Sequence, residues 1–397
     1  MKRILFVEDN ELLLELYGVM LDPDRDHWQT YLAPNGEAAL GLLRQTPFDV
    51  VVSDMQMPGM NGIELLSEAR KLHPQSARII ISGATDQAEA ADSLNCTHLF
   101  IPKPVDVKLL RDTLTRIGKL DAYLKDAKLR ELVGKMGSLP SFPTLYLEIL
   151  REIEAPNCSI EKVADLVAKD PAIAAKILRV ANSAAVGLGE RVTNLREAVQ
   201  QLGLTTVRSL VLSAQVYGNF APGRMKDFSA DQLWNHLMKC ADLARTIMRR
   251  DRAEVAETED AFTAGMLHDM GKLMLADGMP TEFAQSMELA ARENLSQVEA
   301  ERAVMGADHA GLAAYLFGLW GLPASIVEAV AFHHAPEQSD LKRPSALTAV
   351  HVASALLSEP GSAALNHDYL TEIGVADRLD EWQDTATELQ METANER

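Results

Sequence analysis

The chain reads Val50-Val51-Val52-Ser53-Asp54-Met55-Gln56-Met57-Pro58-Gly59-Met60-Asn61-Gly62 in the middle of its first third. Three consecutive valines indicate a short strand that is buried on both faces. The apolar run stops at an acidic residue, Asp54, and the Pro58-Gly59 pair that follows indicates a turn. In parallel sheets, ligand chemistry takes place beyond the carboxyl ends of the strands. This stretch therefore predicts a buried strand of a parallel sheet, with a candidate site beyond the carboxyl end of that strand.

Four more short apolar runs surround this one, and amphipathic segments with helical spacing separate them. The predicted strands are Ile4–Val7, Thr30–Ala33, Val50–Ser53, Ile79–Ser82 and Leu99–Ile101. Strands that alternate with helices indicate a parallel sheet covered on both faces. Residues 1–120 are therefore expected to form a doubly wound α/β domain.

Charged side chains follow three of these predicted strands. Glu8 and Asp9 follow the first, Asp54 follows the third, and Lys103 follows the fifth. Because the carboxyl ends of parallel strands meet at one edge of the sheet, these side chains are expected to share one pocket. Clustered carboxylates favour a hard divalent cation with oxygen ligands, and we expect Mg²⁺. A carboxylate fixed beside Mg²⁺ and a lysine is able to attack a phosphoryl group.

This set of residues resembles the receiver domain of two-component response regulators, a flavodoxin-like (βα)₅ fold, over essentially all of residues 1–120. The resemblance implies that Asp54 is the phosphorylation site. It also implies that Glu8, Asp9 and Asp54, with the backbone carbonyl of Gln56, hold Mg²⁺. Lys103 would contact the phosphoryl oxygens, and the peptide bond between Lys103 and Pro104 is expected to be cis.

The resemblance also assigns a switch to this domain. Ser82 occupies the position of the switch hydroxyl, and Phe100, three residues before Lys103, occupies that of the switch aromatic residue. Phosphorylation adds about −1.5 to −2 charges and new acceptor oxygens. Ser82 would turn toward these oxygens and Phe100 would rotate into the vacated space. The surface made by the fourth and fifth helices is expected to change as a result.

Residues 121–137 are predicted to form a helical connector. A stripe of apolar residues runs along the segment, and the sequence Leu139-Pro140-Ser141-Phe142-Pro143 breaks the helical pattern sharply. The stripe fits a helix that packs on its own domains, and it also fits a dimerisation surface.

Strand patterns disappear after Pro143, and residues 138–360 are predicted to form an all-α domain. Residues 361–397 form an acidic segment, since the last 32 residues carry nine acidic and two basic side chains. We expect a docked helix at Leu370–Leu379 and frayed residues over the final dozen positions.

Six residues of the all-α domain follow the order H…HD…H…HH. They are His236, His268, Asp269, His309, His333 and His334. Imidazole and carboxylate groups are good ligands for Fe, Mn or Zn. The order resembles the HD superfamily of metal-dependent phosphohydrolases, in which metal ions activate water. Each histidine also has a simpler interpretation, as a core residue bonded to a carbonyl or carboxylate group.

Other segments narrow the resemblance to the HDOD domain, an all-helical signalling module whose catalytic set is typically incomplete. These segments are Leu139-Pro140, Lys169-Asp170-Pro171, Arg179-Val180-Ala181-Asn182-Ser183, Leu202-Gly203 and Trp320-Gly321-Leu322-Pro323. The final aspartate of the HD pattern is missing, and His351 occupies its place. The loop that follows the paired histidines in enzymes that cleave cyclic dinucleotides is also absent after His334. The sequence therefore favours a vestigial metal site over hydrolysis.

Composition excludes several other classes. The net charge is −19 and no basic cluster of useful length occurs, which argues against binding to nucleic acids or membrane surfaces. No apolar run approaches the roughly 20 residues that span a bilayer. The three scattered cysteines, Cys96, Cys158 and Cys240, suit a reducing cytoplasm.

The sequence thus predicts a response regulator that does not bind DNA. A sensor histidine kinase or phosphotransfer protein would phosphorylate Asp54, and the HDOD domain would change its contacts with a downstream protein, with a second copy of the chain, or with both. The alternative is a metal-dependent phosphohydrolase or phosphodiesterase that the receiver controls. Mg²⁺ is the expected receiver cofactor, and Fe, Mn or Zn is the candidate for the histidine cluster.

Overall fold

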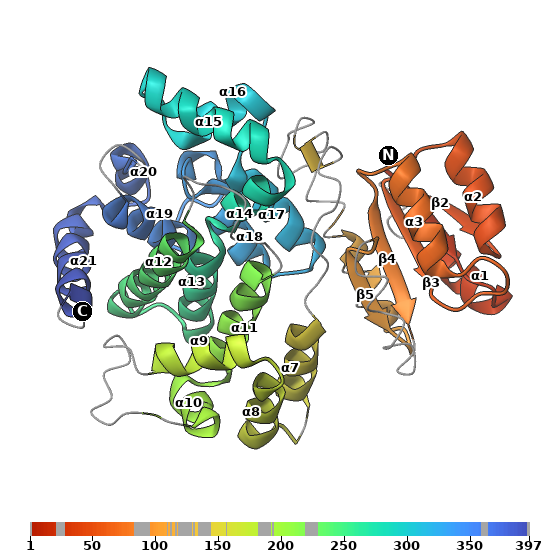
Figure 1. Cartoon of the computed structure of the whole chain (residues 1–397), viewed down its shortest axis with the longest axis horizontal. Coiled ribbons are helices and arrows are strands. Elements are labelled where there is room, and N and C mark those ends of the chain that lie inside the picture. Colours follow the sequence, from red (N-terminus) through yellow and green to blue (C-terminus); the bar gives the residue numbers. More distant parts are fainter. Residues whose placement is uncertain are drawn as a thin grey trace. The chain divides into compact units, whose positions relative to one another are not determined.

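The structure is a computed structural model. It describes residues 2–20, 28–82, 96–108, 110–111, 113–115, 117, 129, 132–133, 144–155, 157–181, 192, 194–218, 229–358 and 364–394. The chain divides into two units, one largely within residues 1–142 and one largely from residue 143 onward. The first contains a sheet and the second is helical (Figure 1).

The first unit is built on a five-stranded parallel sheet. Its strands are β1 (Lys2–Val7), β2 (Trp28–Ala33), β3 (Val50–Asp54), β4 (Ala77–Ser82) and β5 (Leu99–Pro102). Their order across the sheet is β2-β1-β3-β4-β5, and every neighbouring pair is parallel. The predicted α/β fold with a parallel sheet is therefore confirmed, and β3, the strand of the three valines, lies at its centre and is buried along its whole length.

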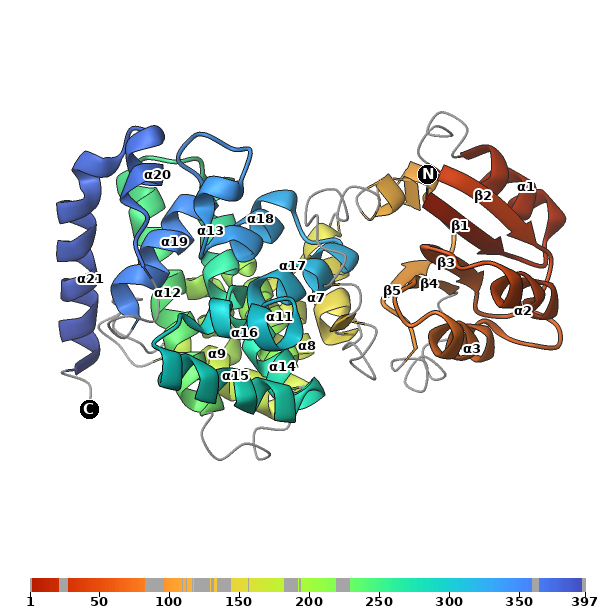
Figure 2. The same cartoon turned by 90° about the horizontal axis from the view of Figure 1, so that it is seen from above.

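Helices cover both faces of this sheet. Helix α1 (Glu11–Met20) lies on one face, where Tyr17 stacks on Phe6 of β1. Helices α2 (Gly36–Gln45) and α3 (Gly62–Leu72) pack on the other face, against apolar side chains of β1 and β3 such as Leu5 and Val51 (Figure 2). Val51 and its neighbours are thus covered from both sides, as the continuous apolar run indicates.

Three strands begin two residues before the predicted positions. The difference arises because polar side chains at these strand starts interrupt the apolar run, as Lys2 and Gln29 do in β1 and β2. Arg78 does the same in β4, yet it is buried. Its guanidinium group donates hydrogen bonds to the carbonyls of Pro74, Ser76 and Cys96, which compensate its burial.

A glycine closes the turn that follows β3. The chain returns so tightly after Asp54 that the backbone N–H of Gly62 donates to the carbonyl of Met55 at 3.0 Å. A Cβ atom on Gly62 would lie 2.2 Å from the carbonyl oxygen of Asp54, which is well inside van der Waals contact. Asn61 and Glu64 form a capping box at the start of α3. The Pro58-Gly59 turn therefore leads directly into α3 and fixes the end of β3.

The second unit is all-α, as predicted. Its helices are α7 (Thr144–Glu154), α8 (Ile160–Ala168), α9 (Pro171–Ala181), α10 (Leu195–Leu202), α11 (Leu204–Gly218), α12 (Ala230–Arg250), α13 (Val255–Leu267), α14 (Met270–Gly278), α15 (Pro280–Glu293), α16 (Gln297–Met305), α17 (His309–Leu319), α18 (Ala324–Phe332), α19 (Ala346–Leu357), α20 (His367–Glu372) and α21 (Leu379–Ala394). Among the helices of the described residues, none has both the length and the apolar composition needed to cross a membrane.

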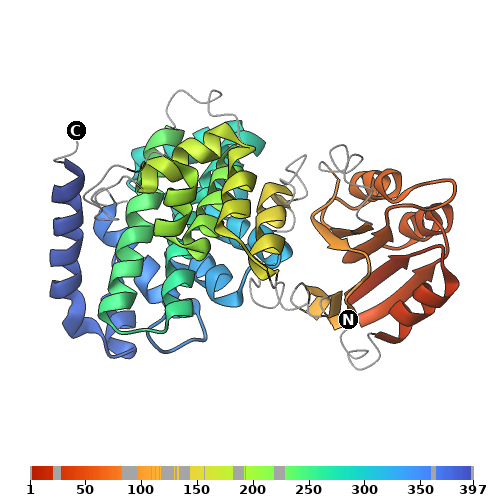
Figure 3. The same cartoon turned by 90° about the horizontal axis from the view of Figure 1, so that it is seen from below.

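Helices α12, α13 and α19 form the centre of the helical unit, where each packs on the other two (Figure 3). Two glycines allow backbones to approach closely there. A Cβ atom on Gly265 would lie 2.6 Å from the Cα atom of Ala241 in α12, and one on Gly271 would lie 1.9 Å from the carbonyl oxygen of His309. Both glycines therefore set the spacing of helices that flank residues 268 and 269.

The acidic C-terminal segment differs from its prediction. Instead of one helix at Leu370–Leu379 and frayed residues after it, the structure has α20 and the longer α21, which reaches Ala394. Helix α21 packs on α12 and α19 (Figure 2). Trp382 is buried, and Arg250 of α12 donates to Thr385 and pairs with Glu388. The buried tryptophan and the arginine thus dock a helix that lies later in the chain than expected and includes most of the residues expected to fray.

Several predicted features lie outside the described residues. Of the connector at 121–137, only Leu129, Leu132 and Val133 are described, and all three are helical and buried. Most of the segment after β4, at 83–95, and the sequence motif at 182–183 are not described. The expected change at the fourth and fifth helices of the receiver stays a prediction.

Candidate functional site

The first candidate site lies at the carboxyl edge of the parallel sheet. Glu8 and Asp9 directly follow β1, Asp54 ends β3, and Lys103 directly follows β5. Carboxylate oxygens of Glu8, Asp9 and Asp54 all lie within 4.8 Å of one another. The Nζ atom of Lys103 lies 2.8 Å from Oδ1 of Asp54 and 3.8 Å from Oε2 of Glu8. The sheet therefore brings the four charged residues together.

Burial makes negative charge on the carboxylates of this site unfavourable. Glu8 is 1% exposed and Asp54 is 3% exposed, whereas Asp9 is exposed to solvent. Burial raises the pKa of Glu8, and the nearby carboxylate of Asp54 raises it further, while Lys103 lowers it. Oε2 of Glu8 is buried and has no hydrogen-bond partner among the described residues. A buried carboxylate oxygen without a partner, beside two further carboxylates, is a donor set that fits Mg²⁺.

The remaining predicted receiver residues are Gln56, Ser82 and Phe100, and they belong to the strands that end at the same edge or closely follow them. Gln56 lies two residues after β3, and Ser82 ends β4, where its carbonyl accepts a hydrogen bond from the backbone N–H of Lys103 at 2.7 Å. The bond between Lys103 and Pro104 is cis, as expected. Phe100 is part of β5, but its side chain is outside the described residues.

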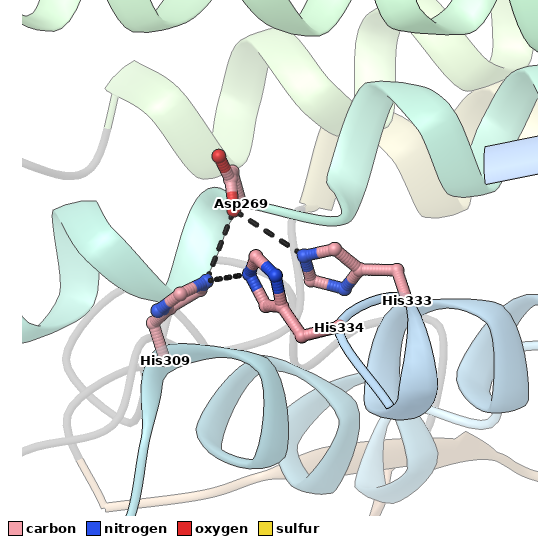
Figure 4. Close-up of side chains that lie close together, drawn as sticks. All are labelled: Asp269, His309, His333 and His334. Carbon is pink, nitrogen blue, oxygen red and sulfur yellow. Dashed lines mark hydrogen bonds and ion pairs between the residues drawn. The ribbon is translucent and has the colours of Figure 1, made fainter. Parts of the chain in front are cut away.

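The second candidate site is a cluster of histidines around Asp269 in the helical unit. Asp269 lies in the turn between α13 and α14, His309 begins α17, and His333 and His334 follow α18. Oδ1 of Asp269 lies 3.0 Å from Nε2 of His309 and 3.5 Å from Nε2 of His333. The Nε2 atoms of His309 and His334 are 3.1 Å apart (Figure 4).

Two further predicted histidines face the other oxygen of Asp269. Oδ2 lies 3.6 Å from Nε2 of His268 and 3.8 Å from Nε2 of His236 in α12. The five histidines that the sequence order singled out therefore all lie around the carboxylate of the sixth residue, Asp269. The structure adds Cys240, which the sequence interpretation missed, with its Sγ atom 3.4 Å from Nε2 of His236. Its spacing of four residues from His236 on one helix was the signal available in the sequence.

Hydrogen bonds from Nδ1 to backbone carbonyl oxygens orient two of these rings, those of His268 and His333. Nδ1 of His268 lies 2.8 Å from the carbonyl oxygen of Gly265, and Nδ1 of His333 lies 2.9 Å from that of Val330. These carbonyls place a ring proton on Nδ1 and leave Nε2 facing Asp269. Both Nε2 atoms are buried and have no hydrogen-bond partner among the described residues. Buried imidazole nitrogens and carboxylate oxygens that face one another without a hydrogen bond form a donor set that fits an Fe, Mn or Zn ion.

His309 is held differently from the other rings. Its Nδ1 atom and its backbone N–H both contact Oε2 of the fully buried Glu301, at 2.7 and 2.8 Å. Burial opposes a charge on this ring, but the carboxylates of Glu301 and Asp269 outweigh it and raise the pKa of His309 to about 9. Burial lowers the pKa of His334 well below its usual range, and burial likewise lowers that of His268. The cluster therefore holds one protonated ring beside neutral ones.

Lys272 supplies a further positive charge to this cluster. Its Nζ atom lies 2.6 Å from Oδ2 of Asp269, one turn along α14. Burial raises the pKa of Asp269, but Lys272 and the surrounding histidines outweigh it and hold that pKa well below its usual range. Asp269 therefore remains a carboxylate in the protein interior.

The structure decides two details of this cluster that the sequence order left open. His268 and Asp269 form the turn between α13 and α14. His351 does not substitute for the missing aspartate, because both its ring nitrogens are used elsewhere. Nδ1 donates to the carbonyl of His333 at 2.7 Å, and Nε2 accepts from the backbone N–H of Asn366 at 3.0 Å. His351 thus supports the turn that carries His333 rather than facing the cluster.

Comparisons with known proteins identify both domains. The family model of the response regulator receiver domain matches residues 4–115, and that of the HDOD domain matches residues 139–336. A response regulator receiver protein of Anaeromyxobacter sp. (strain Fw109-5) is 38% identical over 114 residues, 28% of this chain and 47% of that protein. An uncharacterized protein of Treponema pallidum is 26% identical over 251 residues, 61% of this chain and 44% of that protein. The chain thus spans less than half the length of these two relatives.

A solved structure gives the same result for the helical unit. The crystal structure of an HDOD domain protein with unknown function from Geobacter sulfurreducens aligns with a TM-score of 0.54 and 21% identity. The alignment covers 68% of this chain and 99% of that one. At this identity the similarity establishes the fold of the helical unit.

The buried carboxylate of Glu8 yields a first prediction. In wild-type protein, Mg²⁺ at about a hundred times its dissociation constant is expected to stabilise the receiver unit by about 2.7 kcal/mol. Glu8→Gln is expected to abolish this stabilisation, yet without Mg²⁺ it should be at least as stable as wild type, because it removes a buried charge that Asp54 repels. Urea unfolding with and without Mg²⁺ measures both effects. Glu15→Gln, on the exposed face of α1, is the control and should behave as wild type. An equal Mg²⁺ response in Glu8→Gln would refute the assignment.

The contact between Glu301 and His309 yields a second prediction, for protein freed of metal by a chelator. The pKa of His309 is raised in the folded state to about 9, so its stabilisation is complete below about pH 6.5 and is lost as the pH rises to about 9. The loss amounts to at most about 3 kcal/mol. Glu301→Gln should flatten this dependence, whereas Glu293→Gln, an exposed control, should not. Urea midpoints at pH 6, 7.5 and 9 test it, and identical slopes in all three proteins would contradict it.

Proposed function

The chain is a response regulator that joins a receiver domain (4–115) to an HDOD domain (139–336), and on this premise we propose that Asp54 accepts a phosphoryl group from a histidine kinase or phosphotransfer protein. The acyl phosphate then changes the protein–protein contacts of the HDOD domain. The observation that carries the proposal is the buried Asp54 carboxylate, held 2.8 Å from Nζ of Lys103 beside the buried Glu8.

The geometry supports phosphoryl transfer to Asp54. A carboxylate oxygen of Asp54 forms the bond to phosphorus as the bond from phosphorus to the donor's histidine nitrogen breaks. Such transfers depend on positioning and on neutralising the charge of the phosphoryl oxygens. Lys103 lies where it can contact these oxygens. Mg²⁺, held by Glu8, Asp9, Asp54 and the backbone carbonyl of Gln56, supplies further charge neutralisation when it is bound.

The switch is proposed to run through the end of β4. The acyl phosphate carries about −1.5 to −2 charges in place of the single negative charge of the Asp54 carboxylate, beside Lys103. Ser82 lies at the same sheet edge, and its backbone is tied to Lys103 by a hydrogen bond. We propose that its hydroxyl turns to donate to a phosphoryl oxygen and that Phe100 fills the space it leaves.

An exposed apolar stripe on α1 supports a protein as the phosphoryl donor. Leu12, Leu16 and Val19 are 78%, 45% and 63% exposed, and their spacing places them along one side of the helix. Helix α1 begins two residues after Asp9, so this stripe starts at the edge of the sheet that carries Asp54. Contiguous exposed apolar side chains are typical of protein-binding surfaces.

Two features of the Asp269 cluster favour an adaptor role for the HDOD domain. Lys272 already pairs with Oδ2 of Asp269, and His351 offers no ligand in place of the missing aspartate. Hydrolytic metal sites need an open position beside a complete ligand set. The proposed output is therefore a change in binding to a downstream protein, to a second copy of the chain, or to both.

A receiver-controlled phosphohydrolase is the second candidate function. The observation in its favour is the pair of buried Nε2 atoms of His268 and His333, which point toward Asp269 without a partner among the described residues. This arrangement is expected of metal ligands rather than of ordinary core histidines.

Phosphorylation of Asp54 yields a third prediction. Wild-type protein incubated with a small-molecule phosphoryl donor and Mg²⁺ should gain one phosphoryl group, detected by intact-mass spectrometry. Asp54→Asn should lose this product entirely, because the amide oxygen is not a nucleophile of comparable strength. Asp165→Asn, on the exposed face of α8, should be labelled like wild type. Stoichiometric labelling of Asp54→Asn would reject the site.

The second candidate function yields a fourth prediction. If the cluster hydrolyses phosphate esters, protein loaded with Fe, Mn or Zn should release phosphate from members of a nucleotide panel. The double variant His268→Ala/Asp269→Ala should then lose both the bound metal and the activity. The adaptor proposal predicts instead that no member of the panel is hydrolysed, even by metal-loaded wild-type protein. Metal-dependent turnover that the double variant lacks would decide for the enzyme.

A further inference from the structure

Cys240 is the residue near Asp269 that neither domain's proposed chemistry uses. It lies one helical turn after His236 on α12, and its side chain is fully buried. The Sγ atom of Cys240, a ring nitrogen of His236 and a ring nitrogen of His268 all lie within 4.8 Å of one another. A buried cysteine alone is more often a small core residue. Here, however, the buried Nε2 atom of His268 has no hydrogen-bond partner among the described residues.

The distances within this group match a tetrahedral site. With Zn–S bonds of about 2.3 Å and Zn–N or Zn–O bonds of about 2.0–2.1 Å, the ligand-to-ligand edges of a tetrahedron are roughly 3.4–3.6 Å. The edge from Sγ of Cys240 to Nε2 of His236 is 3.4 Å. The edges from Oδ2 of Asp269 to Nε2 of His268 and of His236 are 3.6 and 3.8 Å. Three of the six ligand-to-ligand distances are thus close to those of a tetrahedral site.

We propose that His236, Cys240, His268 and Asp269 form a tetrahedral zinc site in which Cys240 supplies a thiolate ligand. A ligand set of one sulfur, two imidazole nitrogens and one carboxylate oxygen favours Zn²⁺ over hard cations. The thiolate takes the place of the ligand that the missing aspartate would have provided. Since all four positions are filled by protein, no open position remains for a substrate or a water nucleophile.

Two neighbouring groups shape this site. The carbonyl of Gly265 holds Nδ1 of His268, so the ring presents Nε2 to the ion. Lys272 contacts the same oxygen of Asp269 at 2.6 Å and balances part of its charge. Burial raises the pKa of the Cys240 thiol, so the sulfur carries its proton in the metal-free protein and releases it to solvent when the ion binds.

The site is independent of phosphorylation and is tested with Co²⁺, which replaces Zn²⁺ in tetrahedral sites. Full-length protein freed of metal and titrated with Co²⁺ should gain an intense near-ultraviolet absorption, because a thiolate transfers charge to cobalt. Cys240→Ser should lose this band and bind Zn²⁺ at least about tenfold more weakly. Cys96→Ser and Cys158→Ser should retain the band and the affinity, since the chain holds only these two other cysteines.

Each outcome decides the proposal. Visible cobalt bands without the near-ultraviolet band, with unchanged binding in Cys240→Ser, would keep a metal pocket but refute Cys240 as a ligand. Failure of wild-type protein to bind either Co²⁺ or Zn²⁺ would refute the site altogether. If Cys240→Ser does not fold, X-ray absorption at the zinc edge of wild-type protein gives the answer, since one sulfur at about 2.3 Å is expected and its absence refutes the ligand. Labelling of Asp54 should be the same in every cysteine variant, so the two proposals fail separately.

Discussion

In each unit a carboxylate lies almost wholly out of reach of water, and its charge is balanced by cations that the protein places beside it. Asp54 is paired with Lys103, and Asp269 is paired with Lys272 and with the protonated His309. A buried charge without a partner costs several kcal/mol, so these pairs constrain every element that carries them. In the receiver unit, the constraint fixes the ends of β1, β3 and β5 relative to one another. In the helical unit, it fixes the starts of α14 and α17 and the turn after α18.

Close approach of backbone segments brings the neighbouring groups into contact with both carboxylates. Gly62 lets the chain fold back over Asp54, while Gly265 and Gly271 let α12, α13, α14 and α17 meet around Asp269. A methyl group at any of these positions would contact a neighbouring backbone at less than 3 Å. These three positions therefore require glycine, and the placement of Asp54 and Asp269 depends on the close packing that glycine allows.

The two candidate sites differ in how many of the expected metal ligands they contain. At the edge of the sheet, three carboxylates and a lysine form a set in which a buried oxygen of Glu8 still lacks a hydrogen-bond partner, as expected of a site that receives a divalent ion. Around Asp269, the ring of His351 is turned to the backbone and leaves one ligand position to be filled. The nearby thiol of Cys240 offers that ligand with a different chemistry. The proposed phosphoryl transfer to Asp54 and the proposed fully ligated zinc site are both consistent with the adaptor proposal.

The sequence by itself determined the parallel sheet and the all-α second domain and indicated most residues of both candidate sites, because buried strands, helical spacing and charged residues at strand ends are local patterns. The order of five histidines and one aspartate in the second domain also indicated that these six side chains form one cluster. Only the tertiary structure decided that His268 and Asp269 lie in a turn, that His351 faces a backbone carbonyl and that Cys240 joins the cluster. It alone showed that Trp382 and Arg250 dock the acidic C-terminal helix. The direction of a side chain depends on which helices pack together, and residues distant in sequence fix that packing.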